Sequence, residues 1–154
     1  MDAKLREIIK QHLTYEIEML FATQAKLQAG EPDRNVRNAL IESFCIHARN
    51  LIDFLRGKRS GVRASSVTYD YTPFADGEID REYRRMIEEQ ITHLGFGRTS
   101  NPVEQINGRV QATLLSSIAK ELVRFKHHIR EQYPCPWEIE IGDQIIFKKF
   151  AETE

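Results

Sequence analysis

The stretch Leu40–Leu55, LIESFCIHARNLIDFL, is the most apolar continuous segment of the chain. Its apolar side chains recur at three- and four-residue spacings, which predicts a helix. Asp33 precedes it as a candidate N-cap and Gly57 follows it, so we expect the helix to cover residues 34–56. A second apolar stripe runs beside the first, which is typical of a helix covered on several sides. The stretch therefore predicts the central helix of a small bundle.

Three more helices are predicted around this one. The first covers residues 3–28, the third 78–94 and the fourth about 102–131, each with apolar residues on one face. The connection between the first two helices is short, so they should be antiparallel neighbours. The expected fold class is all-α, an up-down four-helix bundle with a long loop, residues 57–77, between the second and third helices.

The C-terminal residues change period. Apolar and acidic residues alternate through Trp137–Ile141, and Gly142 and Asp143 follow, which predicts a β-hairpin with a two-residue type II′ turn. A lone hairpin is marginally stable in water, so it should pack on the bundle or on a partner. We expect a single domain in which residues 1–133 form the bundle and residues 134–154 form the hairpin extension.

Composition sets limits on function. The chain has 154 residues, 41% of them hydrophobic and 29% charged, as expected for one globular domain. The net charge of −1 gives no global basic excess to argue for nucleic acid. No apolar run reaches the ~20 residues of a membrane-spanning helix, and the N-terminal residues lack the apolar core of a signal peptide. Two cysteines, Cys45 and Cys135, make no disulfide framework. These features predict a cytoplasmic protein with no membrane partner, and no cofactor is indicated.

Helical wheels place five polar residues on inward faces at a similar height in the bundle: Glu16, Ser43, His47, His93 and Asn107. A buried carboxylate is costly unless it is paired, so a histidine partner for Glu16 is expected. Three interpretations are open. The cluster is a structural network that fixes packing, it performs acid–base chemistry through His47 or His93, or it holds one metal ion between two histidines and Glu16. A dimetal site is not indicated because the chain has no Glu-x-x-His motif.

Other polar residues accompany this cluster. His12 lies on the same stripe as Glu16, Asn50 lies beside His47, and Glu121 falls within the apolar face of the fourth helix.

The opposite face of the second helix carries Arg49 and Asp53 as an i, i+4 pair, with Glu42 nearby. Such a pair is either a solvated salt bridge or part of a face that docks against the long loop or another subunit.

The long loop combines basic and aromatic residues. This combination suits single-stranded nucleic acid, through phosphate contacts and base stacking, although a solvated, partly ordered loop is the interpretation we favour. The residues concerned are Arg56, Lys58, Arg59, Arg63, Tyr69, Tyr71 and Phe74.

The segments HARNLIDFL (His47–Leu55) and HLGFGR (His93–Arg98) resemble a family of uncharacterised bacterial helical proteins. The resemblance implies that a set of polar residues acts together: Glu42, His47, Arg49, Asn50, Asp53, His93 and Arg98. More distantly, a small bundle with inward histidine and arginine is similar to HEPN domains, many of which are metal-independent ribonucleases of toxin–antitoxin and defence systems. Their signature is Arg-x(4–6)-His, which this chain matches literally from Arg6 to His12, while Arg124 and His128 are one residue too close.

These observations lead to three functional hypotheses. The first is a cytoplasmic HEPN-like protein that binds or cleaves RNA without a metal, with His47 and His93 as acid–base residues and Arg98 as a phosphate contact. The supporting binding residues are Glu16, Ser43, Asn50, Asn107, Arg49 and Asp53. The second is a non-enzymatic module that forms a homodimer or binds another protein. The third is a mononuclear metal-binding bundle.

Overall fold

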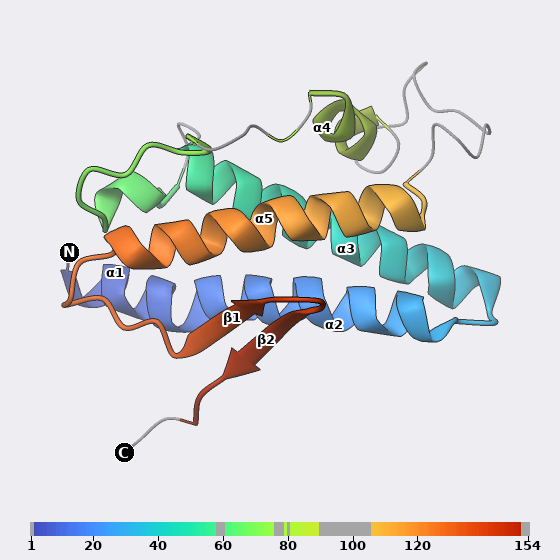
Figure 1. Cartoon of the computed structure of the whole chain (residues 1–154), viewed down its shortest axis with the longest axis horizontal. Helices are drawn as coiled ribbons and strands as arrows, with labels where there is room; N and C mark the ends of the chain where they lie inside the picture. Colours follow the sequence, from blue (N-terminus) through green and yellow to red (C-terminus); the bar gives the residue numbers. More distant parts are fainter. Residues whose placement is uncertain (1, 58–60, 76–78, 80, 90–105, 152–154) are drawn as a thin grey trace.

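The structure is a computed structural model that describes residues 2–57, 61–75, 79, 81–89 and 106–151. The described chain is mostly helical and ends in a two-stranded antiparallel sheet, as expected. Figure 1 shows the long helical segments side by side along the molecule, with the short helix α4, Arg81–Ile87, above them and the hairpin on the lower side. None of the helices in the described part of the chain combines the length and apolarity needed to span a bilayer.

The first helical segment contains a π-helical turn that the sequence pattern did not predict. Helix α1 covers Asp2–Glu7, the π-helix Ile8–Leu13 and α2 Thr14–Ala29, after which Gly30 takes a positive φ of 86°. The apolar positions in this segment are three to four residues apart, a spacing that predicts an α-helix throughout and does not mark a single wider π turn within it. The periodicity therefore gave the extent of the segment but not the π turn.

Helix α3 covers Arg34–Arg56, the range expected from the sequence. Asp33 caps it, because its Oδ1 accepts hydrogen bonds from the backbone N–H of Asn35 at 2.8 Å and of Val36 at 3.0 Å. Gly57 ends it in the left-handed conformation, with φ +73°. Helix α3 runs antiparallel to α2 (Figure 1) and buries a row of side chains against its neighbours: Phe44, Cys45, His47, Ala48, Leu51, Ile52 and Leu55.

Helix α5 covers Gly108–His128 and differs from the expected range at both ends. The predicted start near residue 102 lies outside the described residues. Asn107, expected to face inward, is instead the exposed N-cap, with Oδ1 accepting from the N–H of Arg109 and of Val110. At the other end the chain leaves the helix because Ile129 forms a β-bridge with Thr68.

The segment between α3 and α4 is packed against the bundle. It contains a 3₁₀ turn at Ala64–Ser66, and Val67, Tyr71 and Phe74 are buried. The prediction that its aromatic rings are available to stack on bases is therefore wrong for Tyr71 and Phe74, because both rings fill the core. Tyr69 alone of the three remains exposed, at 61%.

Helix α4 covers Arg81–Ile87, a smaller part of the predicted range 78–94. Residues 90–105 lie outside the described part of the chain. Met86 and Ile87 are buried, so α4 contributes to the core despite its length.

Strands β1, Trp137–Ile141, and β2, Ile145–Lys149, pair as an antiparallel hairpin. The connection has three residues rather than the predicted two, because Ile141 pairs with Ile145. This register sets Phe147 opposite Ile139, where its ring stacks on Phe21 of α2 with the centroids 5.5 Å apart. Trp137 is fully buried, so the hairpin packs on the bundle. Packing against α2 has thus overridden the turn preference.

Candidate functional site

Glu16 and His47 meet between α2 and α3, as the helical wheels predicted. His47 Nδ1 lies 2.7 Å from Glu16 Oε2, and Asn50 donates to the same oxygen from Nδ2 at 3.1 Å. Because a carboxylate oxygen only accepts, Nδ1 carries the proton and Nε2 is the nitrogen left for other partners. The ring of Tyr15 stands edge-on to His47, with the centroids 5.7 Å apart. The side chains of His47 and Glu16 are 10% and 25% exposed, so the pair lies below the surface without being sealed from it.

The structure brings together only part of the predicted polar cluster. Ser43 is half-buried on α3 and takes no part in the Glu16 network, and Asn107 lies at the start of α5 as its cap. His12 is exposed rather than inward. His93 and Arg98 lie outside the described residues.

Arg49 and Asp53 form the expected pair on α3, with Arg49 Nε 3.9 Å from Asp53 Oδ2. Both side chains are partly covered, and a small depression beside them is also lined by Arg84 and Ile87 of α4. This face of α3 is therefore the one that α4 approaches. The structure supports neither a fully solvated ion pair nor a free docking face at this position.

A pocket of about 410 Å³ opens beside Glu16. Its walls come from the π-helical turn, from the C-terminal half of α3 and from Val62. The lining is mainly apolar, and its polar members are Lys4, His12, Glu16 and Asn50. A concave, mostly apolar pocket with a few converging polar groups is the usual form of a small-molecule site.

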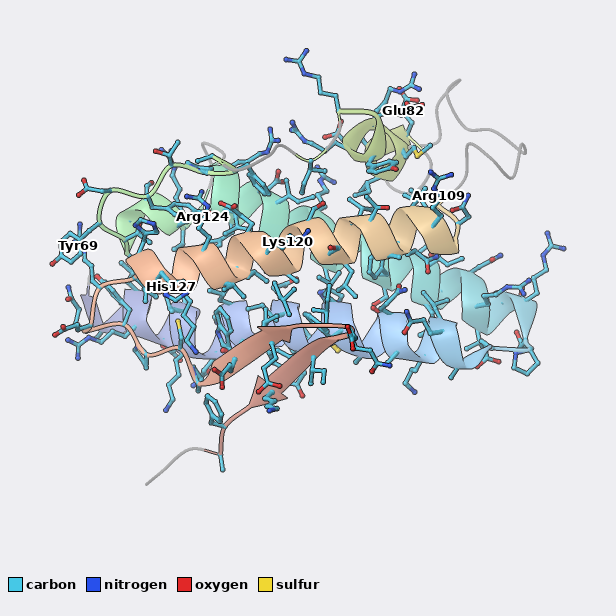
Figure 2. All side chains as sticks on the ribbon, in the orientation of Figure 1. Tyr69, Glu82, Arg109, Lys120, Arg124 and His127 are labelled. Atoms are coloured by element: carbon cyan, nitrogen blue, oxygen red, sulfur yellow. The ribbon has the colours of Figure 1, made fainter. Side chains whose placement is uncertain are left out.

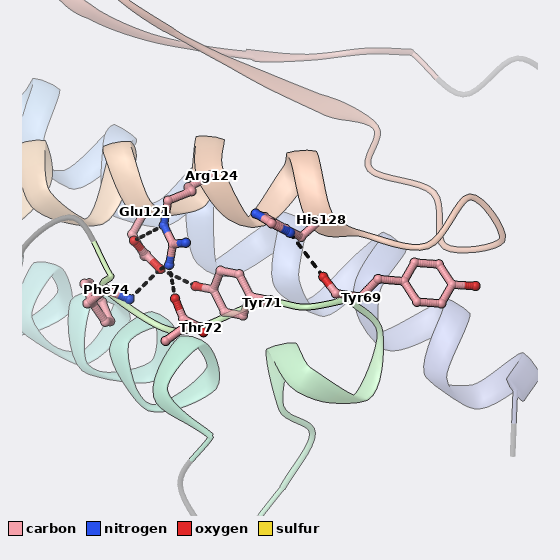
Figure 3. A network of polar contacts seen from close by, with 7 residues as sticks. All are labelled: Tyr69, Tyr71, Thr72, Phe74, Glu121, Arg124 and His128. Atoms are coloured by element: carbon pink, nitrogen blue, oxygen red, sulfur yellow. Dashed lines mark hydrogen bonds and ion pairs between the residues drawn. The ribbon is translucent and has the colours of Figure 1, made fainter.

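Figure 3 shows a second polar network, centred on Glu121 of α5. Glu121 Oε1 accepts from Tyr71 Oη at 2.5 Å, from the N–H of Phe74 at 2.8 Å and from Arg124 Nη2 at 2.8 Å. Arg124 Nε donates to the other oxygen at 3.1 Å, and its Nη2 also donates to the carbonyl of Thr72. The sequence marked Glu121 as an inward polar residue but missed Tyr71 and Phe74 as its partners, because they lie about fifty residues earlier in an aperiodic segment.

The Glu121 network holds a strained backbone in place. Phe74 has a φ of +52°, a left-handed conformation that costs a bulky residue about 1–2 kcal/mol. Its N–H is one of the donors to Glu121, and its ring lies under the guanidinium of Arg56 at 5.1 Å. The strain persists because these contacts fix the segment.

The hydrogen bonds of this network determine the protonation states of Glu121 and Tyr71. Burial by itself raises the pKa of Glu121, but donation from Arg124, Tyr71 and the Phe74 N–H outweighs it, so the pKa lies below its ordinary value. Burial and the neighbouring Glu121 carboxylate raise the pKa of Tyr71. Glu121 is therefore ionised and Tyr71 neutral at physiological pH, and neither is poised to exchange a proton.

Next to this network lies a surface patch formed by Tyr69, His128 and Arg130, which we call the Tyr69 patch. His128 Nδ1 donates to the Tyr69 carbonyl at 3.1 Å, so its Nε2 carries no proton when the ring is neutral. The guanidinium of Arg130 lies 4.7 Å from the centroid of the exposed Tyr69 ring. Figure 2 shows Tyr69 and His127 at the same end of the molecule, where α5 ends. The sequence pointed to Tyr69, and to His128 only as a residue one position too close to Arg124, and it did not point to Arg130, which follows α5.

Two further chemistries, metal binding and nucleophilic attack by a cysteine thiolate, have little support among the described residues. Within the described ranges, no three His, Cys, Asp or Glu side chains are placed to hold a metal ion. Burial raises the pKa of the Cys45 thiol to about 12 and that of Cys135 to about 11, so neither is a thiolate nucleophile at neutral pH.

Comparisons with protein-family models, curated proteins and solved structures give no match.

Proposed function

We propose that this protein binds single-stranded RNA at the Tyr69 patch and cleaves it without a metal ion, as a cytoplasmic HEPN-like protein of a toxin or defence type. The observation that carries the proposal is the setting of His128: Nδ1 is occupied by the Tyr69 carbonyl, and Nε2 makes no hydrogen bond to any described residue. A half-buried imidazole in this tautomer is suited to accept a proton. We propose in addition that the helices are arranged as an up-down four-helix bundle.

The neighbours of His128 suit an RNA strand. The ring of Tyr69 is 61% exposed and offers a surface on which one base stacks. Arg130 lies over that ring and presents guanidinium N–H groups to a phosphate. Aromatic rings next to arginine are typical of proteins that bind unpaired bases.

The proposed reaction needs no group beyond RNA and water. His128 Nε2 takes the proton of a ribose 2′-hydroxyl, and that oxygen attacks the adjacent phosphorus. The bond from phosphorus to the 5′-oxygen breaks, and water protonates the leaving oxygen. The products are a 2′,3′-cyclic phosphate and a 5′-hydroxyl, while Arg130 offsets the negative charge that develops on the phosphate.

A cleavage assay tests the proposal. A labelled single-stranded RNA is incubated with the protein in excess chelator, beside the DNA of the same sequence, which lacks the 2′-hydroxyl. His128→Asn is expected to slow cleavage by about 100-fold or more, because general-base catalysis contributes ~10²–10⁴-fold. Tyr69→Ala should weaken RNA binding by roughly tenfold, since stacking on one ring contributes ~1–3 kcal/mol.

His127→Asn is the matched control, because His127 is the exposed neighbour of His128 and should leave the rate unchanged. A His47→Asn variant separates the Tyr69 patch from the site expected from the sequence, in which His47, His93 and Arg98 act together. Full activity in His128→Asn with loss in His47→Asn would move the chemistry to the buried pair. Absence of binding and of cleavage would remove the RNA function.

A second candidate function is self-association through the hairpin. Three large apolar side chains on it or next to it are exposed: Ile141 at 42%, Ile146 at 45% and Phe150 at 46%. A homodimer would cover them, and Ile146→Lys should then shift the protein to monomer in sedimentation equilibrium. A parent chain that is monomeric at every concentration would exclude this function.

A further inference from the structure

The pocket beside Glu16 has an apolar wall that comes from three parts of the chain. Ile8 and Leu13 belong to the π-helical turn, Leu51 and Phe54 to α3, and Val62 follows the α3 C-terminus. Its volume of about 410 Å³ is within the ~300–1,000 Å³ of typical small-molecule sites. Single π turns inside α-helices concentrate at functional sites, and this one lines the pocket.

Two polar residues of the pocket lining have acceptor oxygens that no described residue uses. Glu16 Oε2 receives both His47 and Asn50, whereas no described residue donates to Oε1. Asn50 uses its Nδ2 on Glu16, and no described residue donates to its Oδ1. Both residues line the pocket. Two residues of the pocket lining therefore each keep one acceptor oxygen without a donor among the described residues, and one of these oxygens belongs to a carboxylate.

We propose that this pocket binds a small organic cation with a planar amidinium or guanidinium head on an apolar body. Such a head has two parallel N–H donors, which match Glu16 Oε1 and Asn50 Oδ1, and charge-assisted pairs of this kind are the strongest hydrogen bonds in proteins. The body is buried against the wall formed by Ile8, Leu13 and Leu51, which adds apolar burial.

Two other residues at the pocket favour the opposite sign of charge. Lys4 and His12 are exposed and line the pocket as well. A lysine ammonium on a flexible stem turns into water at little cost, so Lys4 need not face the ligand. Glu16 is half-buried and held by two donors, so its charge is fixed in place. We infer that the fixed charge selects the ligand. An anionic ligand on Lys4 and His12 is the competing outcome.

A titration with three small molecules of similar shape tests which sign of charge the pocket prefers in its ligand. Benzamidine, benzoate and benzyl alcohol share a phenyl body and carry a cationic, an anionic and a neutral head. Each is added to ¹⁵N-labelled full-length protein, and the amide shifts in α1, α2 and α3 are followed. Benzamidine is expected to bind at least tenfold more tightly than the other two, with shifts around Glu16, Asn50 and Val62. Equal or tighter binding of benzoate, or no saturable shift with benzamidine, would overturn the proposal.

Variants assign the site within the protein. Glu16→Gln keeps the shape of the side chain and removes its charge, so it should weaken benzamidine binding at least tenfold. Glu18→Gln is the matched control, because Glu18 lies on the same helix and pairs with Lys149 outside the pocket, and it should bind as the parent does. Val62→Trp narrows the pocket without touching the Glu16–His47 pair, and it should also abolish binding. If Glu16→Gln and Val62→Trp both bind benzamidine normally, the ligand lies elsewhere.

The pocket shares no residue with the Tyr69 patch. A negative result in the benzamidine titration would therefore leave the proposed RNA function unaffected, and a negative cleavage assay would leave the proposed ligand unaffected.

Discussion

Glu16 and Glu121 are both carboxylates placed on inward helix faces, yet their surroundings differ. Glu121 is 6% exposed and receives donors from Tyr71, Phe74 and Arg124 on both oxygens. Glu16 is 25% exposed, receives two donors on one oxygen and none from the described residues on the other, and lines a pocket. A fully satisfied buried network fixes structure, and a partly satisfied one retains capacity to bind. The Glu121 network therefore holds the segment that contains Tyr71 and Phe74 in place. The Glu16 pair is the site at which we propose that a ligand binds.

The largest loss of stability is expected from replacing Glu121, whose two carboxylate oxygens both accept hydrogen bonds. Glu121→Leu should lower the free energy of unfolding by about 3–5 kcal/mol, because the largely buried guanidinium of Arg124 then loses the carboxylate that balances its charge. Urea unfolding followed by circular dichroism measures it. Glu42→Leu, at an exposed position on α3, should change stability by less than about 0.5 kcal/mol. Equal effects of the two variants would mean that the Glu121 network does not stabilise the fold.

The same carboxylate makes stability depend on pH. Because donors hold the pKa of Glu121 below its ordinary value of 4.5, its contribution is fully present above that pH and is lost as pH falls through the folded-state pKa. The stability difference between the parent and Glu121→Gln should therefore be largest at neutral pH and shrink in acid. Urea unfolding over a pH series tests this. A difference that stays constant down to the acid limit would contradict the assignment.

An intermediate effect is expected from the tyrosine that donates to Glu121. Tyr71→Phe keeps the buried ring and removes one hydrogen bond to a charged group, which should cost about 2 kcal/mol. Thermal unfolding measures the loss. Tyr69→Phe, whose ring is exposed, serves as the matched control and should unfold with the parent.

The smallest effect is expected at the partly satisfied site. Glu16→Leu should lower the free energy of unfolding by about 1 kcal/mol, because His47 loses one hydrogen-bond partner while exposed Asn50 turns to water. Urea unfolding beside Glu18→Leu isolates the effect. A loss as large as that of Glu121→Leu would show that the Glu16 pair is equally sealed, and a gain would show that it serves packing alone.

Local sequence signals predicted the bounds of a helix where a cap, an apolar period and a terminating residue were all present. Helix α3 has an N-cap aspartate, a sustained apolar period and a terminal glycine, and it occupies the predicted range. The contact between Glu16 and His47 was also predictable, since two helices joined by a short connection bring residues at equal distance from the turn to the same height.

Long-range contacts decided what the patterns left open. Helix α5 ends at His128 because Ile129 pairs with Thr68 across the chain. The hairpin takes a three-residue connection because that register directs Phe147 onto Phe21. The π turn has no signature in the apolar spacing.

The sequence by itself determined the helical class, the central helix and the inward position of Glu16, His47 and Glu121, because periodicity and caps are local properties of the chain. Only the tertiary structure decided which of these carboxylates is closed and which is open to solvent. That outcome depends on the aperiodic segment from Gly61 to Ala75, whose Tyr71 and Phe74 N–H complete the partners of Glu121 beside Arg124, while no described residue donates to Oε1 of Glu16. No local pattern records which distant segment packs over a given side chain.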